Sequence, residues 1–222
     1  MKKTTLLFTA LTVSAVSSVA MAAGWEDNMY SGDAFIGFEG GYAKPKVKVY
    51  GIPGESDDKN GAGYFGVRFG SYWNDNARAY LSLNYIEQED AYLREDSSGS
   101  TEYKVHGVKQ LNLLASADYL FMPESELRPF AGLSVGGTRT EARGYNVPDP
   151  SLPGKSVGSF EKKWSLSYGA QAGAIYQMDN FDLEAGVKFL TSGSSHHYDK
   201  DHDIKLKVNR SAQLYAAASI HF

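Results

Sequence analysis

Five residues near the carboxyl-terminal end of the chain have side chains of the kind that bind transition metals. They are His196, His197, Asp199, Asp201 and His202. Imidazole and carboxylate groups are ligands for Zn²⁺ and related ions. Their spacing matches no closed-site signature, and the chain has no cysteine to supply a thiolate ligand. The sequence therefore predicts a solvated polar loop here, with a metal site formed by these residues as the alternative.

Nucleophilic catalysis would need a serine with a histidine base within hydrogen-bond reach. His106 has no serine two residues away on the same side of a strand. His221 is the penultimate residue, at the opposite end of the last extended segment from the loops. We therefore expect no catalytic residue, no enzyme activity and no cofactor.

A second polar stretch, residues 87–104, is dominated by carboxylates. Six acidic residues stand there against Arg94 and Lys104: Glu87, Glu89, Asp90, Glu95, Asp96 and Glu102. Such a stretch could hold divalent cations or meet a basic partner. The sequence favours a solvated loop.

The first 22 residues are set apart from the rest of the chain. Lys2 and Lys3 precede the apolar stretch Leu6–Val19, and residues 20–22 read Ala-Met-Ala. This is the pattern of a secretory signal peptide. An uncleaved membrane helix, which needs roughly 20 apolar residues, is the alternative. Residues 23–222 are then expected to form one domain.

Charge and composition exclude several classes of protein. With the two lysines of the signal peptide removed from 22 basic residues, 20 remain against 26 acidic ones, a net charge of −6. Nucleic acid recognition needs a basic surface, so we expect no nucleic-acid partner. Because the chain has no cysteine, it has no disulfide.

The region after the signal peptide alternates between apolar and polar side chains. In Ser211–Phe222, apolar residues occur at every second position from Leu214 onward, which is typical of a β-strand with one apolar face. Seven further segments show the same alternation: residues 34–44, 63–73, 77–86, 105–121, 129–140, 163–177 and 181–190.

The connections between these segments are alternately long and short. The long ones are residues 45–60, 87–104, 141–162 and 191–203. Long loops at one end and short turns at the other are typical of an outer-membrane barrel. An unpaired backbone group is costly in hydrocarbon, so only a closed sheet can span a bilayer. The sequence therefore predicts an all-β fold, an eight-stranded antiparallel up-and-down transmembrane β-barrel with four long extracellular loops.

Aromatic residues occur near both ends of the predicted strands, as expected for two lipid–water interfaces. Those beside the short turns are Tyr72, Trp73, Tyr119, Phe121, Phe130, Tyr176, Phe181 and Phe222. Those toward the long loops are Tyr42, Tyr85, Trp164 and Phe189.

Charged residues occur on the strand face opposite the apolar one. Those predicted to point into the lumen are Glu39, Arg68, Arg78, Asp118, Glu184 and Lys188. An eight-stranded barrel leaves a lumen just wide enough for side chains to fill. Because a buried charge without a partner is costly, we predict a salt-bridged polar plug. We expect Glu39 near Arg68 and Arg78 near Asp118, and a conduction path lined by the same charges is the alternative.

The stretches Arg128–Gly136, Ser167–Gly173 and Phe181–Val187, with the terminal Phe222, resemble the small outer-membrane β-barrel proteins of Gram-negative bacteria, the opacity-protein-like family. The likeness covers essentially the whole chain after the signal peptide. One departure is Ile220, where the family often has an aromatic residue third from the end.

This resemblance implies a location in the cell outer membrane. In the family, the barrel-assembly machinery reads the terminal aromatic strand, so Phe222 is the expected assembly signal. The family's long loops mediate adhesion or resistance to host defences. This implies host or surface ligands for the loops, besides outer-membrane lipid and lipopolysaccharide around the barrel. We therefore expect a non-enzymatic protein of surface interaction, adhesion or envelope integrity, with a narrow porin-like channel for small solutes as the alternative.

Overall fold

The structure is a computed structural model that describes residues 34–50, 61–95, 102–142, 145–146, 156–157, 163–199 and 204–222. The predicted signal peptide, residues 1–22, and the predicted domain start at residue 23 lie outside these residues and stay predictions. Within the described part of the chain, no helix is long and apolar enough to cross a membrane.

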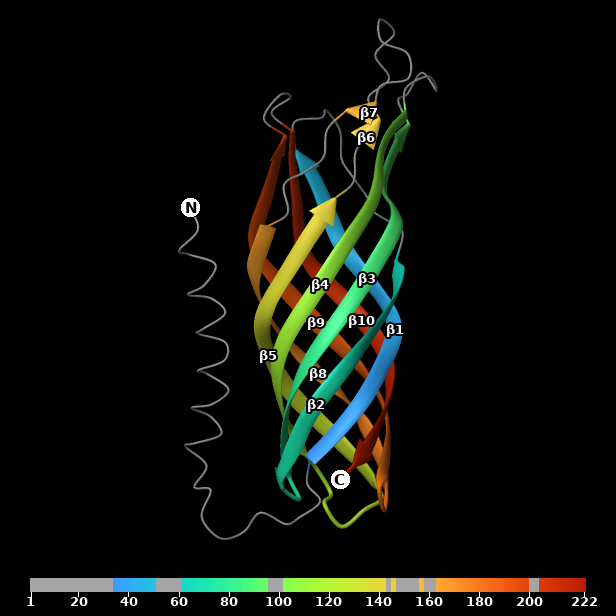
Figure 1. The fold of residues 1–222 in the computed structure, drawn as a ribbon, viewed down its shortest axis with the longest axis vertical. Coiled ribbons are helices and arrows are strands. Elements are labelled where there is room, and N and C mark those ends of the chain that lie inside the picture. Colours follow the sequence, from blue (N-terminus) through green and yellow to red (C-terminus); the bar gives the residue numbers. More distant parts are fainter. Residues whose placement is uncertain are drawn as a thin grey trace, which may run out of the picture.

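The described residues form ten β-strands, of which eight are long. The long strands are β1 (Ala34–Tyr50), β2 (Ala62–Asn74), β3 (Ala77–Glu95), β4 (Glu102–Leu120), β5 (Leu127–Ala142), β8 (Lys163–Met178), β9 (Phe181–Asp199) and β10 (Ile204–His221). The short strands β6 (Tyr145–Asn146) and β7 (Ser156–Val157) extend the sheet from β4. Each long strand pairs antiparallel with the long strands before and after it, and the β1–β10 pairing closes the cylinder (Figure 1). The predicted eight-stranded antiparallel β-barrel is confirmed.

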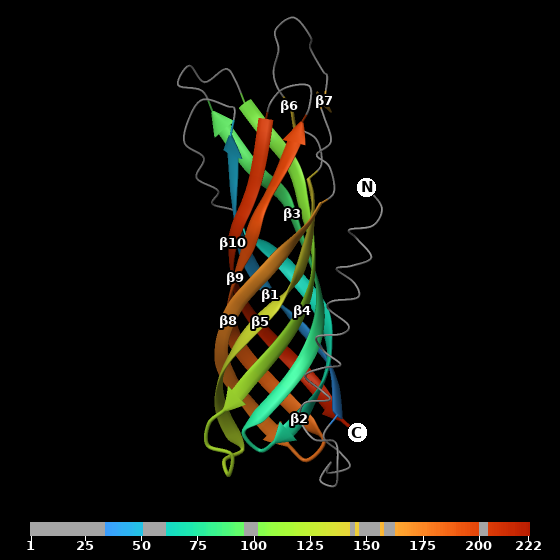
Figure 2. The ribbon, with the colours of Figure 1, turned by 90° about the vertical axis from the view of Figure 1, so that its left-hand side faces the viewer.

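The first and last strands form the seam of the barrel. Their register runs from Phe35↔His221 to Tyr50↔Lys205. Beyond β10, the Phe222 amide donates to the Ala34 carbonyl at 3.0 Å. The carboxyl terminus lies at the end of the barrel that carries the short turns, called the turn end below (Figures 1 and 2). The opposite end is called the loop end. Because the seam is paired along its length, it presents no open strand edge.

Outward side chains form an apolar belt around the barrel. Their exposed fractions are large, for example 69% for Phe38, 69% for Leu133 and 63% for Leu214. Along β4 the belt runs from Leu111 to Phe121, which lies just after the strand. At about 3.3 Å per residue and a strand tilt of about 40°, this stretch is about 25 Å tall. That height equals the apolar band of outer-membrane barrels, about 25 Å.

Several strands continue past the apolar belt into segments that the sequence predicted as loops. In the acidic stretch, β3 and β4 stay paired up to Glu95↔Glu102. In the His/Asp stretch, β9 and β10 stay paired up to Asp199↔Ile204. The prediction of long loops is wrong for these two connections. The apolar alternation ends where the strands leave the belt, whereas backbone pairing needs no apolar face and continues.

The loop predicted from Pro45 onward also begins later, because Pro45 lies within β1. Beyond the pair Ala43↔Ala62, β1 no longer pairs with β2 and pairs with β10 alone. A strand paired on one side tolerates a residue that lacks an amide donor. The sequence analysis assigned residues 45–60 to a loop and therefore ended β1 too early.

Aromatic side chains mark both ends of the apolar belt, with two corrections. Tyr72 and Phe130, predicted for the turn-end girdle, are buried in the lumen at 8% and 2% exposure. Both occupy inward positions of the alternation, next to the outward residues Trp73 and Ala131. Position along the strand therefore does not decide whether an aromatic ring faces lipid or lumen.

Candidate functional site

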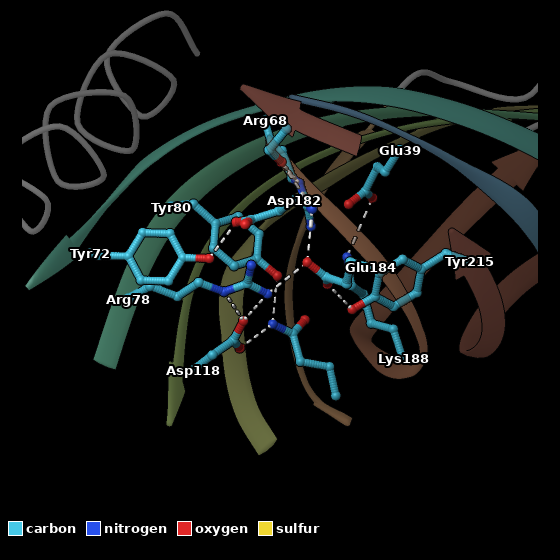
Figure 3. Close-up of polar contacts among 12 residues, drawn as sticks. Glu39, Arg68, Tyr72, Arg78, Tyr80, Asp118, Asp182, Glu184, Lys188 and Tyr215 are labelled. Carbon is cyan, nitrogen blue, oxygen red and sulfur yellow. Dashed lines mark hydrogen bonds and ion pairs between the residues drawn. The ribbon is translucent and has the colours of Figure 1, made fainter. Parts of the chain in front are cut away.

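The lumen contains the six charged side chains that the sequence predicted to point inward. Each has at most 3% of its surface exposed: Glu39, Arg68, Arg78, Asp118, Glu184 and Lys188. They come from β1, β2, β3, β4 and β9 and point toward one another across the barrel (Figure 3). Each stands between apolar or glycine neighbours in the chain, so the period of two in a strand turns the charge inward.

Arg68, Arg78, Asp118 and Glu184 form one ion-paired cluster, called the charge network below. Arg78 donates from Nε and Nη2 to Asp118 Oδ2 at 2.9 and 2.8 Å. Glu184 Oε2 lies 2.8 Å from Nη2 of Arg68 and of Arg78. These two contacts are ion pairs by distance rather than aligned hydrogen bonds. With two cations and two carboxylates, the network carries no net charge, which reduces the cost of burying it.

Neutral side chains add hydrogen bonds to the charge network. The Tyr215 hydroxyl donates to Glu184 Oε1 at 2.8 Å. Arg68 donates to Ser219 Oγ from Nε at 3.3 Å and from Nη2 at 3.1 Å. These contacts tie the network to β10, the strand on one side of the seam.

Aromatic rings cover the two guanidinium groups. The Arg78 guanidinium carbon lies 5.2 Å from the Tyr80 ring centroid and 5.1 Å from that of Phe130. The Arg68 guanidinium carbon lies 5.6 Å from the Tyr80 ring centroid. A cation over an aromatic face is attracted by the ring quadrupole, more strongly when water is excluded. The inward direction of Phe130 thus has an electrostatic as well as a packing effect.

Two glycines at inward positions leave room for the acceptors of the arginines. A Cβ atom at Gly132 would collide with Asp118 Oδ1, and one at Gly37 would collide with Ser219 Oγ. A larger residue at either position would displace an acceptor, because the collision involves a side chain already held by an arginine.

A second cluster joins Tyr72, Asp182 and His221 at the turn end. Asp182 Oδ2 accepts a hydrogen bond from the Tyr72 hydroxyl at 2.6 Å and lies 2.7 Å from His221 Nε2. The Tyr72 and His221 rings stack, with centroids 5.3 Å apart and planes 22° apart. The sequence analysis predicted none of the three as site residues. The signal was present, because alternation places Asp182 on the same face as Glu184.

Glu39 and Lys188 form a separate ion pair. Lys188 Nζ lies 3.4 Å from Glu39 Oε1 and 5.1 Å from the Tyr215 ring centroid. Glu39 Oε2 has no hydrogen-bond partner among the described residues. The expected neighbours Glu39 and Arg68 do not pair, because Arg68 is held by Glu184. In the β1–β2 register Glu39 stands opposite Gly66, and its side chain reaches Lys188 on β9.

One wall of the lumen carries neutral polar side chains that bond to one another across the strands. Thr138 Oγ1 donates to Asn112 Oδ1 at 2.7 Å and shares a 2.6 Å hydrogen bond with Ser167 Oγ. Lower on the same wall, Ser134 Oγ donates to Gln171 Oε1 at 3.0 Å. This face, on β4, β5 and β8, is called the hydrogen-bonded wall below.

The other wall, on β10, β1, β2 and β3, is called the open wall. Among the described side chains, it carries buried polar atoms without a hydrogen-bond partner, on Glu39, Tyr64, Ser82, Asn84, Ser211 and Gln213. Buried polar groups in proteins are almost always bonded to protein or to ordered water. The open wall is therefore the side of the lumen whose chemistry suits bound water.

The predicted metal-binding set cannot be placed. Asp201 and His202 lie outside the described residues. His196, His197 and Asp199 belong to β9, but their side chains are not among those that the structure describes. Among the side chains that the structure does describe, no three histidine, aspartate or glutamate groups lie close enough to hold a metal ion. The metal alternative stays a prediction.

Solved structures share the fold of this chain. Neisserial surface protein A (NspA) is 19% identical, with 85% of this chain and 97% of that chain covered and a TM-score of 0.51. OprG from Pseudomonas aeruginosa is 14% identical, with 87% and 97% covered and a TM-score of 0.58. A major outer membrane protein from Thermus thermophilus is 12% identical, with 85% and 99% covered and a TM-score of 0.50. No protein-family model and no curated protein sequence matches the chain. At these identities the likeness shows the fold, and it confirms the resemblance to small outer-membrane β-barrels.

Proposed function

Starting from the fold that this chain shares with small outer-membrane β-barrel proteins, we propose that it is a non-enzymatic outer-membrane protein that serves surface interaction, adhesion or envelope integrity. The observation that carries the proposal is the inverted distribution of polarity. Apolar side chains cover the outside, and paired charges fill the inside. A bilayer solvates such an exterior, whereas water would not. Export through a cleaved signal peptide and assembly through Phe222, whose side chain is 64% exposed, belong to the same proposal.

The loop end supplies the surface for such interactions. The β3–β4 hairpin rises about 20 Å beyond Leu111 at the usual strand rise and tilt. Its base is braced by the ion pair of Lys109 Nζ and Glu87 Oε1 at 2.6 Å. A paired hairpin of this length carries Glu95 and Glu102 beyond the level of the lipid headgroups. One protein of the same fold, Neisserial surface protein A, is by name a surface protein.

A narrow channel for small solutes is the second candidate, and the open wall favours it. Glu39, Tyr64 and Asn84 present polar atoms without partners along one side of the lumen. Water bound there would line a polar route along β1, β2 and β3. The charge network opposes this function. The side chains of Arg68, Arg78 and Glu184 meet inside the lumen with 0% exposure and so close it.

Replacing Arg68 by Ala separates the two functions. If the charge network is a structural plug, Arg68→Ala leaves Glu184 with one cation fewer and lowers the free energy of unfolding by about 3–5 kcal/mol. Planar-bilayer recordings of the variant would then stay silent. Steady conductance steps without loss of stability would instead support the channel. The matched control is Lys109→Ala, which breaks a partly exposed ion pair and costs about 0–1 kcal/mol.

Shortening the β3–β4 hairpin tests the role of the loop end. Residues 91–105 are replaced by Asn-Gly, which joins the register pair Asp90↔His106 through a two-residue turn. The barrel should still migrate heat-modifiably on gels, because the apolar belt is intact. Loss of binding to host cells or surfaces would support adhesion.

The control for this experiment shortens the other tall hairpin. Asn-Gly replaces residues 197–206 and joins the register pair His196↔Lys207. If binding is lost in only one variant, that hairpin carries the contact. If binding is unchanged in both while detergent sensitivity of the cells rises, the role is in envelope integrity and adhesion through these hairpins is excluded.

A further inference from the structure

Three cationic side chains stand together on the outer face of the seam. Lys44, Lys46 and Arg210 are exposed, and Lys46 and Arg210 are register partners on β1 and β10. We call this group the basic seam patch. Like charges directly opposite each other on one face of a sheet destabilise the pairing. The arrangement therefore suggests a compensating anion outside the sheet.

The described residues supply no such anion. No ion pair or hydrogen bond joins the side chains of Lys44, Lys46 or Arg210 to another described residue. On the opposite side of the barrel the situation differs. Lys109, at the first outward position beyond Leu111, is paired with Glu87 at 2.6 Å. Among the described residues, the cation beside the belt on β4 thus has an acidic partner, whereas the three at the seam have none.

The basic seam patch adjoins the apolar belt. Lys44 follows the exposed ring of Tyr42 by two residues, and its register partner Ala212 stands next to Phe189 on β9. Lys46 lies about 5 Å higher than Lys44 at the usual strand rise and tilt. Lipid headgroups occupy roughly the first 5–8 Å beyond the hydrocarbon on each side of a bilayer. The patch therefore lies at headgroup level.

The strand register adds an independent feature at the same place. Both pairings of β10 skip Asn209: Lys46 pairs with Arg210 while Val47 pairs with Val208, and the β9 register shifts between the same two residues of β10. A β-bulge redirects the side chains beside it and recurs next to functional sites. Here it brings Arg210 directly opposite Lys46.

We propose that the basic seam patch binds a phosphate group of a lipid in the leaflet at the loop end, whose acyl chains lie along the apolar belt beneath. The proposal rests on the proposed function, because it requires the barrel to be in a bilayer. Arg210 can hold two phosphate oxygens with its planar fork, and the lysines add point charges. A lipid fits better than a soluble anion. The patch faces outward, and its continuity with the belt adds apolar contact only for a ligand that has acyl chains.

The test titrates the full exported protein, in detergent micelles, with bisphosphorylated lipid A and counts bound lipid by native mass spectrometry. The variant Lys46→Gln/Arg210→Gln should bind roughly 30-fold more weakly. Each of the two cations is expected to contribute about fivefold to the affinity for an anionic lipid. The charge-matched control is Lys109→Gln/Arg139→Gln, which removes two cations from β4 and β5 and should bind like the unmodified protein. Higher salt should weaken the binding of the unmodified protein.

Two further probes identify the ligand. Dephosphorylated lipid A and inorganic phosphate should each bind much more weakly than lipid A. Equal binding of dephosphorylated lipid would overturn the proposal, since acyl contact alone would then suffice. Equal binding of inorganic phosphate, or equal loss in the charge-matched control, would also overturn it. Insertion of the unmodified protein into lipid vesicles shows whether a negative result refutes the lipid site alone or the proposed membrane function as well. A protein that inserts but shows no lipid A preference refutes only the patch, whereas one that does not insert refutes both.

Discussion

The charge network and the Glu39–Lys188 pair are both buried in the lumen, but they are held in different ways. In the network, Glu184 contacts Arg68, Arg78 and Tyr215. The Glu39–Lys188 pair has a single ion contact at 3.4 Å, and Glu39 Oε2 on the open wall has no partner among the described residues. Within the part of the chain that the structure describes, Glu184 in the charge network thus has three partners, whereas Glu39 has one.

The difference shows where the lumen is closed most firmly. Removing one member of a connected group of charges leaves the others unpaired in a dry environment, so the cost is large. An isolated pair can be removed as a unit without orphaning a third charge. Lys188 lies four residues nearer the loop end of β9 than Glu184. The side chains that fill the lumen are therefore joined by more contacts toward the turn end, at the charge network, than toward the loop end, at the Glu39–Lys188 pair.

Arg78→Met is the largest perturbation of this comparison. It removes the ion partner of Asp118 and one partner of Glu184, so we expect the free energy of unfolding to fall by about 3–5 kcal/mol. Urea unfolding in micelles, followed by heat-modifiable migration, measures the change. Lys109→Met is the control and should cost about 0–1 kcal/mol. Equal effects of the two variants would show that the charge network does not act as a connected group.

The two walls of the lumen give a smaller, paired prediction. Thr138→Val removes hydrogen bonds to Asn112 and Ser167 and should cost about 1–3 kcal/mol. Tyr64→Phe removes a buried hydroxyl that has no partner among the described residues, so it should cost less than Thr138→Val. Unfolding midpoints of the two variants test this contrast. A cost for Tyr64→Phe as large as that for Thr138→Val would mean that ordered water completes the open wall.

The smallest effect is expected for the double variant Glu39→Gln/Lys188→Met. Both charges leave together, so the stability should stay within about 1 kcal/mol of the unmodified protein. Glu39→Gln alone should cost more, because Lys188 then stays charged and buried. Chemical unfolding of the single and double variants measures this coupling. A double variant that is less stable than the single one would show that Lys188 stabilises the barrel through contacts other than Glu39, such as the Tyr215 ring.

Much of this molecule was predictable because a strand has a local period of two. Charged residues such as Arg68 and Lys188, between apolar neighbours, are buried as predicted, and Phe38 and Leu214 are exposed on the outside as predicted. The alternation also predicted the number of long strands and their antiparallel order.

The sequence analysis failed where the local pattern stops. Past the apolar belt, residues 87–95 have no alternation of apolar and polar side chains, so nothing in the sequence indicated that β3 continues to Glu95. The basic seam patch was missed for a different reason, because residues 45–60 were assigned to a loop. Three lysines at alternate positions, Lys44, Lys46 and Lys48, were the signal that could have extended β1.

The sequence by itself determined which side of each strand faces the lumen, because that depends only on neighbours in the chain. The tertiary structure decided which charges meet. Arg68 bonds to Ser219, 151 positions away, and Arg78 pairs with Glu184 on the far side of the lumen. Such pairings depend on the register of every strand around the cylinder and on how far each side chain reaches across it. These quantities accumulate over the whole closed sheet and are not encoded in any single segment.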